Sequence, residues 1–378
     1  MKYCPICVQP DTRPGSVFNS DGVCPACENH ANAATELDFE LRYELLQEML
    51  EPYRSPSSGA GYDSIMGVSG GKDSTRQALW ARDHLGLNPL LACLTYSPEQ
   101  VTRRGTDNLS NLIELGFDVV ISGPGPQTWK ALLKQGFLDF TNWAKFAEQA
   151  LISSVPQLAV KYGIELILWG ENPGLQLGDL KTIWRNGFDG NNLRYGNTVD
   201  GGRLDLLREA GFAEQDLIPY RHPSVDEFEA AKLQIIYLGW AWNDWSLYNN
   251  AMYAAVEGLE IRSDGVENTG DLGGVSALDE DWVTLNQMIK YYKYGFGRVS
   301  DYLNEELRLG RMKRTQAIEI AQKYDGACSD EYIELFCDYI GITKAFFWDH
   351  VRKSVNRDLF DVRANGEIVP RFKVGVGL

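Results

Sequence analysis

The sequence predicts an α/β protein with a doubly wound parallel sheet, an N-terminal cysteine-rich knuckle and a mainly helical C-terminal region. Between residues 62 and 169, short apolar runs alternate with segments of helical periodicity, as in strand–helix–strand units. A glycine-rich turn joins the first of these strands to its helix. From about residue 279 onward the periodicity is helical.

Two C-x-x-C pairs open the chain: Cys4 with Cys7, and Cys24 with Cys27, separated by sixteen residues. Four thiolates at this spacing can form a tetrahedral cage for Zn²⁺. The loop between the pairs is rich in turn formers and poor in apolar residues, so the metal would supply much of its fold. An iron–sulfur cluster or a redox pair is the alternative. We expect residues 1–34 to be a zinc-binding knuckle.

The rest of the chain divides into three parts. Residues 35–60 should form an amphipathic helix and a Pro/Ser/Gly linker, residues 61–240 the α/β domain, and residues 241–378 a mainly helical domain. The expected strands are 62–68, 89–95, 117–122, 164–169 and 235–238, and the expected helices of the α/β domain are 73–86, 105–115 and 141–162. The expected C-terminal helices are 280–293, 298–309, 314–324, 329–340 and 343–353. Residues 173–224 show little periodicity. The aromatic run 240–245 is expected to pack in the core, with a ligand-stacking wall as the alternative.

The glycine-rich turn spans residues 67–74, between a strand and the start of a helix. Backbone N–H groups and the helix dipole at such a turn favour an anion. Gly70 and Gly71 would let the backbone approach a phosphate, Ser69 and Ser74 would add hydroxyl donors, and Lys72 would add a charge. The spacing differs from a Walker A loop, because three residues separate Gly67 from Gly71 and Asp73 follows the lysine.

Two neighbouring strand ends should lie beside this loop, because parallel sheets bind ligands at the carboxyl ends of their strands. Thr95 and Gly170 follow apolar runs at the points where the sequence turns polar. We therefore expect both residues to help bind a nucleotide.

Composition sets limits on partners and compartment. The net charge is −16, from 36 basic and 52 acidic residues, which does not favour nucleic acid. No apolar run approaches the roughly 20 residues that a membrane span requires. The chain opens without a hydrophobic signal core, so we expect a cytoplasmic protein.

The string Ser-Gly-Gly-Lys-Asp-Ser at residues 69–74 resembles the PP-loop of the ATP pyrophosphatases, also called adenine nucleotide α hydrolase-like proteins. The resemblance implies that ATP is cleaved between its α and β phosphates. Pyrophosphate would stay in the loop, and AMP would pass to an oxygen of the substrate. It also implies that Asp73 helps to position Mg²⁺.

The combination of motifs resembles the N-acetyl sugar amidotransferases. It consists of the CPxC pairs, the PP-loop, Gly170-Glu171-Asn172, Lys-Tyr-Gly-Phe-Gly-Arg at residues 293–298, and residues 310–315. The resemblance implies an ATP-dependent, AMP-forming amidotransferase that converts the acetamido group of a nucleotide-linked sugar into an acetamidino group. This chemistry belongs to bacterial surface polysaccharides such as lipopolysaccharide O-antigen. Lys72, Asp73, Lys293 and Arg311 would be catalytic, and Arg298 is a further candidate for the phosphate or the sugar nucleotide.

The resemblance also implies a glutaminase and a cyclase-like partner that deliver ammonia. The cysteines outside the knuckle are Cys93, Cys328 and Cys337, and none lies in a nucleophile elbow. We therefore expect no glutaminase activity in this chain. A tRNA-thiolating PP-loop enzyme and a regulatory protein that binds nucleotide without turnover remain the alternatives.

Overall fold

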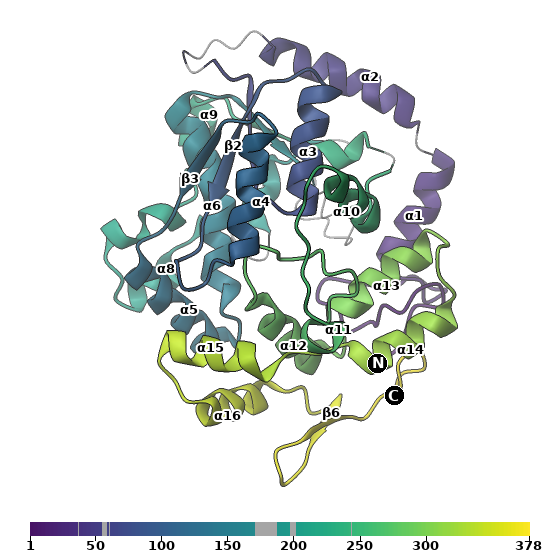
Figure 1. The fold of residues 1–378 in the computed structure, drawn as a ribbon. Coiled ribbons are helices and arrows are strands. Elements are labelled where there is room, and N and C mark those ends of the chain that lie inside the picture. Colours follow the sequence, from purple (N-terminus) through teal and green to yellow (C-terminus); the bar gives the residue numbers. More distant parts are fainter. Residues whose placement is uncertain (37, 55–58, 60, 171–186, 197–201, 243) are drawn as a thin grey trace.

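The computed structural model describes residues 1–378 except 37, 55–58, 60, 171–186, 197–201 and 243. Its main sheet has five strands in the order β3-β2-β1-β4-β5, and every neighbouring pair is parallel (Figure 1). The predicted doubly wound parallel sheet is therefore confirmed. The strands are β1 (Ser64–Gly67), β2 (Pro89–Leu94), β3 (Val119–Ser122), β4 (Leu166–Trp169) and β5 (Gln234–Tyr237).

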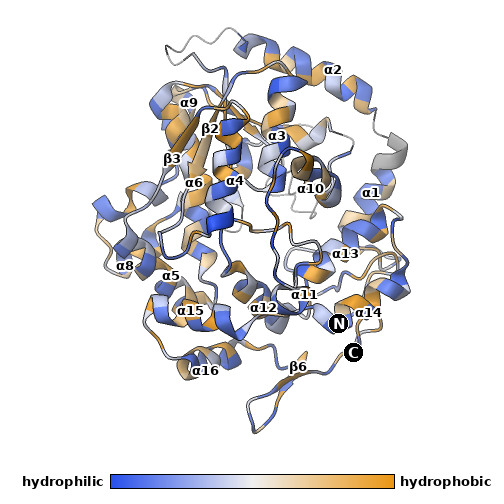
Figure 2. Cartoon of the chain, in the orientation of Figure 1, coloured by the Kyte–Doolittle hydropathy of each residue, from blue (hydrophilic) through white to orange (hydrophobic). Residues whose placement is uncertain are grey.

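The two faces of the sheet follow the alternation of side chains along each strand. Met66 and Leu91 belong to the apolar cluster on the face covered by α3 (Lys72–Asp83) and α4 (Arg103–Glu114). Ile65 and Leu90 pack against α6 (Ala144–Tyr162) and α9 (Val225–Ala230) on the other face. Both faces are covered at β2, which is buried at every position, whereas the edge strand β3 is partly exposed; both strands are largely apolar, as Figure 2 shows.

The crossover from β3 to β4 contains a helix that the sequence prediction missed. One helix was expected at residues 141–162, but the chain forms α5 (Pro126–Phe140) before α6. Pro126 occupies the first turn of α5, where a proline is favoured. Thr141 adopts a left-handed conformation with φ 45° and ends that helix.

The five C-terminal helices match the predicted ranges to within a few residues. They are α12 (Val283–Tyr294), α13 (Arg298–Arg308), α14 (Arg314–Tyr324), α15 (Asp330–Ile340) and α16 (Lys344–Ser354). Ser329 and Thr343 cap α15 and α16 through their hydroxyls, while Gly295 and Gly341 end α12 and α15 in left-handed conformations. The hairpin of β6 (Phe360–Val362) and β7 (Ile368–Pro370) follows.

The C-terminal helices share an apolar core with the α/β part. Phe137 of α5 stacks on Phe347 of α16, with ring centroids 5.2 Å apart, and packs edge-on against Phe336 of α15. Residues 61–240 and 241–378 therefore pack together through α5. A further helix, α10 (Leu247–Val256), packs on α3 (Figure 1).

The N-terminal segment also packs on the C-terminal helices. Val8 lies in one apolar cluster with Val299 and Leu303 of α13, and its N–H donates to Asn304 Oδ1 at 2.9 Å. The N–H of Leu378 donates to the carbonyl oxygen of the first residue, so the two termini lie side by side (Figure 1). The amphipathic helix expected within residues 35–60 forms as α2 (Phe39–Leu50), and a helix that was not expected, α1 (Pro25–Glu36), precedes it.

The remaining predictions concern loops and aromatics. Shorter helical segments include η1 (Glu51–Tyr53), η4 (Asn191–Tyr195), α8 (Asp205–Glu209), η6 (Glu214–Tyr220), η7 (Leu238–Trp240) and α11 (Val266–Thr269). Three of these lie in the stretch 173–224, whose residues 173–186 and 197–201 fall outside the described part. Trp240 and Trp242 are buried, as expected of a packing cluster. Among the described helices, none combines the length and apolarity that a membrane crossing requires.

Candidate active site

The phosphate-binding loop predicted at residues 67–74 runs from the end of β1 into the first turn of α3. The N–H of Gly71 donates to Ser69 Oγ and the N–H of Ser69 to Ser74 Oγ, both at 3.4 Å. Gly70 has φ 77°, and a Cβ there would lie 2.8 Å from the backbone of Asn108 in α4. Only glycine fits this position, because L side chains avoid that φ and the helix leaves no room.

A chain of charged and amide groups holds the first turn of α3. Lys72 Nζ donates to Asp73 Oδ2 at 2.6 Å, and Asn250 Nδ2 of α10 donates to Asp73 Oδ1 at 2.7 Å. Arg76 Nη1 donates to Asn250 Oδ1 at 2.7 Å, and its Nη2 pairs with Asp244 Oδ2 at 2.7 Å. Both oxygens of Asp73 are thus oriented by donors, and the negative charge lies at the favourable end of the helix dipole.

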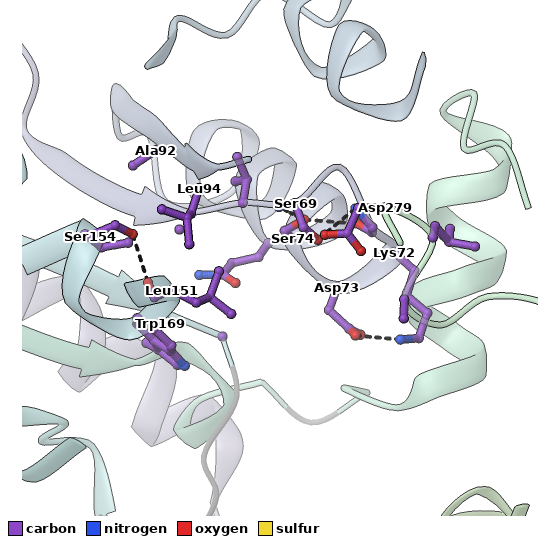
Figure 3. A pocket seen from close by; sticks show the side chains of 18 of the residues that line it. Ser69, Lys72, Asp73, Ser74, Ala92, Leu94, Leu151, Ser154, Trp169 and Asp279 are labelled. Atoms are coloured by element: carbon purple, nitrogen blue, oxygen red, sulfur yellow. Dashed lines mark hydrogen bonds and ion pairs between the residues drawn. The ribbon is translucent and has the colours of Figure 1, made fainter. Parts of the chain in front are cut away.

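A cavity of about 230 Å³ opens over this loop at the carboxyl ends of the strands. It lies where the strand order reverses between β1 and β4, which is the usual ligand position in such sheets. Figure 3 shows two chemically different sides: polar loop residues on one, apolar residues on the other. The polar side includes Ser69, Lys72, Asp73, Ser74 and Asp279, and the apolar side includes Ala92, Leu94, Leu151, Val155 and Trp169. A phosphate fits the polar side and a planar base the apolar side.

One wall of the cavity comes from residues 275–279, just ahead of α12. Asp279 belongs to this wall, and burial raises the pKa of its carboxyl to about 6. The sequence analysis missed Asp279 because it lies some two hundred residues from the loop and belongs to no motif. Asn250 was missed for the same reason.

Gly170 lines the cavity, and its carbonyl oxygen accepts from the N–H of Gly239 at 3.0 Å. A Cβ at Gly170 would lie 2.5 Å from Gln77 Oε1. Thr95 follows β2, where its N–H donates to the carbonyl oxygen of Ser122 at 2.8 Å, and it is not one of the described lining residues. Glu171 and Asn172 lie outside the described residues.

The three cations expected from the C-terminal motifs have different partners in the structure. Lys293 Nζ donates to the carbonyl oxygens of Phe140 and Thr141 at the end of α5, at 2.6 and 3.1 Å. Lys293 is not one of the described cavity-lining residues. Arg298 lies near Tyr302, and its Nη1 is buried without a hydrogen-bond partner among the described residues.

Arg311 reaches the loop indirectly. Its Nη2 donates to Asn249 Oδ1 at 3.0 Å and its Nη1 to Ser246 Oγ at 3.5 Å, at the start of α10. The next residue along α10 is Asn250, which binds Asp73. The structure therefore brings Arg311 to the helix that holds the loop.

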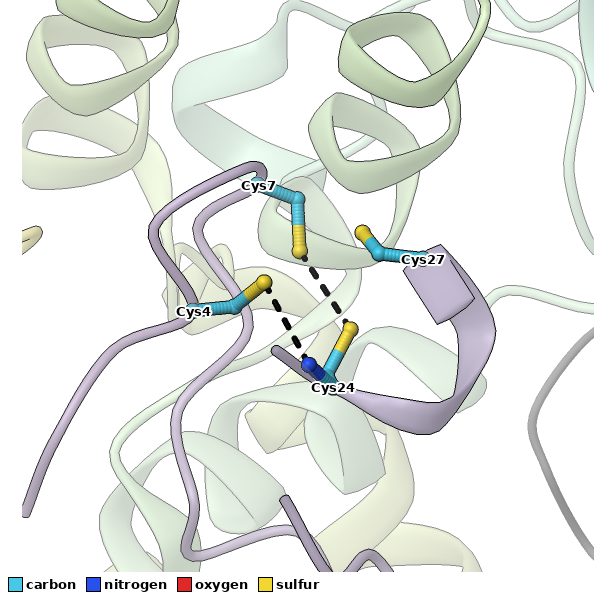
Figure 4. Close-up of side chains that lie close together, drawn as sticks. All are labelled: Cys4, Cys7, Cys24 and Cys27. Carbon is cyan, nitrogen blue, oxygen red and sulfur yellow. Dashed lines mark hydrogen bonds between the residues drawn. The ribbon is translucent and has the colours of Figure 1, made fainter. Parts of the chain in front are cut away.

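The four knuckle cysteines come together as predicted (Figure 4). Their sulfurs lie within 4.8 Å of one another, and Cys7 Sγ is 3.7 Å from Cys24 Sγ. A tetrahedral zinc site with bonds of about 2.3 Å needs sulfurs about 3.8 Å apart. Backbone N–H groups of Cys24 and Gln9 point at the sulfurs of Cys4 and Cys7, both at 3.4 Å. The donor set and spacing fit Zn²⁺, whereas a four-iron cluster binds each thiolate to a different metal atom and needs a wider cage.

The four-cysteine cage is separate from the cavity, since none of its cysteines is among the described lining residues. Arg314 donates to the carbonyl oxygens of Cys7 and Cys4, at 3.1 and 3.2 Å, and so joins the cage to α14. Its position indicates a structural role.

Comparison with protein families gives one match. Residues 276–372 match the family described as "LPS biosynthesis protein WbpG-like, C-terminal domain". The predicted family resemblance is thereby confirmed, at the level of a WbpG-like C-terminal domain that includes Asp279, Lys293, Arg298 and Arg311. A search of the curated proteins finds no match.

Three solved structures are similar to this chain. The NH3-dependent NAD synthetase from Campylobacter jejuni, in complex with the nitrate ion, is 14% identical over 61% of this chain and 100% of its own, with a TM-score of 0.30. The NMN synthetase from Francisella tularensis is 14% identical over 52% and 94%, with a TM-score of 0.29. The U34-tRNA thiolase NcsA from Methanococcus maripaludis, solved with its 4Fe-4S cluster, is 13% identical over 82% and 87%, with a TM-score of 0.31. These scores are too low to carry a conclusion about activity.

Proposed function

We propose that this chain is an ATP-dependent amidotransferase that converts the acetamido group of a nucleotide-linked N-acetyl sugar into an acetamidino group. The observation that carries the proposal is the shared cavity. The loop at residues 69–74 forms one wall, and Ala277, Leu278 and Asp279 of the WbpG-like domain form another. A phosphate loop and a lipopolysaccharide-biosynthesis domain thus meet at one site.

The chemistry proceeds in two displacements. An acetamide carbonyl is a poor electrophile, because the nitrogen lone pair is delocalised into it. Its oxygen attacks the α-phosphorus of ATP and pyrophosphate leaves, which turns that oxygen into a leaving group. Ammonia then bonds to the carbon, the nitrogen loses a proton, and AMP departs with the oxygen. The product is an amidine.

The chain's own groups support the first displacement. The amides at the start of α3 face the phosphates, and Lys72 adds a positive charge on the same wall. Mg²⁺ would offset the charge of the phosphates when bound. Asp73 is the residue expected to hold it, since carboxylate oxygens are preferred Mg²⁺ ligands. Lys72 and Asn250 fix the orientation of that carboxylate in advance.

The test is a reaction of the purified chain with ATP, Mg²⁺, ammonium and a panel of nucleotide-linked diacetamido sugars. We expect AMP and pyrophosphate, and a sugar product in which NH has replaced one oxygen. ADP as the nucleotide product would refute the PP-loop assignment. Sulfur incorporation into tRNA, with salt-sensitive tRNA binding, would support the thiolating enzyme instead.

We also propose that ammonia comes from a glutaminase partner. Cys93 and Cys337 are buried, and burial raises the pKa of Cys93 to about 12 and that of Cys337 to about 11. Neither thiol is therefore activated as a nucleophile. The chain alone should use ammonium and fail with glutamine. Glutamine hydrolysis at the rate of amidine formation would contradict this.

A further inference from the structure

Asp279 is a carboxylate of the cavity to which the first displacement gives no role. Its main chain is fixed against α4, because the N–H of Thr102 donates to the carbonyl oxygen of Asp279 at 2.9 Å. The hydroxyl of Thr102 donates to the preceding carbonyl, of Leu278, at 2.7 Å. A Cβ at Gly105 would lie only 2.4 Å from the Cα of Asp279. The segment therefore presents Asp279 to the cavity from a rigid base.

The charged neighbours of Asp279 are engaged elsewhere. Arg104 and Arg262 each bind Asp281 at 2.8 Å. The Glu280 carboxylate accepts the N–H of Val283 at 2.9 Å. Among the described residues, no side chain donates a hydrogen bond to the Asp279 carboxylate, although the charges of Arg104 and Arg262 lower its pKa in part.

Across the cavity, Lys72 and Asp73 bind each other at 2.6 Å. Cys93 and Tyr96, at the end of β2, also lie near Asp279, and their pKa values are raised, mainly by burial. Both groups are therefore neutral near pH 7. A ligand in the cavity can therefore contact the carboxylate of Asp279, which lies on the same polar side as Ser69 and Ser74 (Figure 3).

We propose that Asp279 is the base that removes a proton from the incoming nitrogen in the second displacement. This inference rests on the proposed function. The nitrogen of ammonia bonds to the activated carbon and becomes cationic. One of its N–H bonds breaks, and the proton passes to a carboxylate oxygen of Asp279. The C–O bond then breaks, AMP leaves with the electron pair, and the proton on Asp279 is returned to solvent.

The environment suits this role near neutral pH. Burial places the pKa of Asp279 at about 6, so the carboxyl is ionised at pH 7 and is a stronger base than an exposed aspartate. Burial and the charge of Asp279 raise the pKa of Glu280 to about 8, so Glu280 is mostly neutral there. A neutral neighbour leaves Asp279 able to ionise.

The test separates the two displacements in the Asp279→Asn variant. Sugar-dependent exchange of labelled pyrophosphate into ATP, without ammonia, reports the first displacement. Amidine formation reports both. We expect exchange to stay within about 3-fold of wild type, while amidine formation falls by about 100-fold or more, the usual contribution of a positioned base. The matched control is Asp281→Asn, which removes a carboxylate of the same segment that binds arginines and does not line the cavity.

A pH profile at constant free ammonia gives the second measurement. Wild type should lose amidine formation as pH falls through about 6, where Asp279 takes up its proton. Asp279→Glu should keep such a limb, and Asp279→Asn should lack it. Equal losses of exchange and amidine formation in Asp279→Asn would overturn the inference, since Asp279 would then serve the phosphates or the fold. Unchanged amidine formation would overturn it too. If wild type shows no exchange with any acetamido sugar, the proposed function itself fails.

Discussion

Replacing Asn250 with aspartate tests how the phosphate loop is held. Asn250 is fully buried on α10, where its amide nitrogen donates to Asp73 and its amide oxygen accepts from Arg76. Asn250→Asp keeps the shape of the side chain and the bond from Arg76. It replaces the donor that faces Asp73 with an acceptor, so two carboxylates meet where a 2.7 Å hydrogen bond stood.

The size of the effect follows from that geometry. Losing a hydrogen bond to a charged group costs about 1.5–3 kcal/mol, which corresponds to roughly 10- to 150-fold in rate if the bond matters in the transition state. Repulsion adds to this at high pH, by about 4 kcal/mol for two charges near 4 Å at an effective dielectric constant of about 20, and Arg76 offsets part of it. A like charge raises the pKa of one carboxyl of the pair. As pH falls through that raised pKa, the new acid can donate to Asp73 again.

The assay is sugar-dependent ATP–pyrophosphate exchange between about pH 5.5 and 8.5. Coupled carboxyl pairs with a raised pKa titrate within roughly this range. We expect Asn250→Asp to lose at least about 10-fold at the alkaline end and to recover part of that loss toward the acid end. The control is Asn249→Asp, which adds the same charge one residue away, where Asn249 binds Asp244 and Arg311 but not Asp73. Equal exchange in the two variants at alkaline pH would refute this account of Asp73.

Three further predictions concern stability. Gly70→Ala should lower the free energy of unfolding by about 1–2 kcal/mol or more, because the φ of Gly70 is 77° and α4 lies 2.8 Å from the new Cβ. The control Gly71→Ala, at φ −73°, should keep the melting temperature of the wild type. Equal melting curves for the two variants would contradict the loop geometry. Cys24→Ser should abolish stoichiometric zinc and lower the melting temperature while sparing pyrophosphate exchange at low temperature, and elemental analysis that finds iron would refute the zinc assignment. Lys293→Met should lower the free energy of unfolding by about 1–2 kcal/mol in calorimetry, because two carbonyls at the end of α5 lose a cationic donor. Loss of pyrophosphate exchange in a variant that stays stable would instead support the catalytic role predicted from the sequence.

The parts of the fold that sequence predicts well are those set by local pattern. β2 is an apolar run, and the loop after β1 carries its own turn chemistry, so the sequence predicted both β2 and this loop. α5 was missed although Trp129, Leu133 and Phe137 lie on one buried face. Its partners are α15 and α16, two hundred residues away, and the glycine at position 136 weakens its helical pattern.

The site was predictable only where one segment carries its chemistry. Lys72 and Asp73 were predicted because they lie in a motif of six consecutive residues. Asn250 binds Asp73 and Asp279 lines the same cavity, but both lie in segments that carry no motif. A single asparagine or aspartate in sequence gives no sign of burial. Their roles depend on how α10 packs on α3 and how residues 275–280 lie against α4, and both are tertiary contacts.

Similar contacts link the WbpG-like domain, residues 276–372, to the loop at residues 67–74, which lies outside that domain. Glu305 of α13 accepts the N–H of Leu247 at 2.8 Å, and Arg311 binds Asn249, so the C-terminal helices hold the first turn of α10. That turn carries Asn250 to Asp73. A change at Arg311 is therefore felt at the loop through α10, and the C-terminal domain supplies a wall of the cavity directly through Asp279. Two short polar paths therefore link the C-terminal domain to this site, one through α10 to Asp73 and one through Asp279 to the cavity wall.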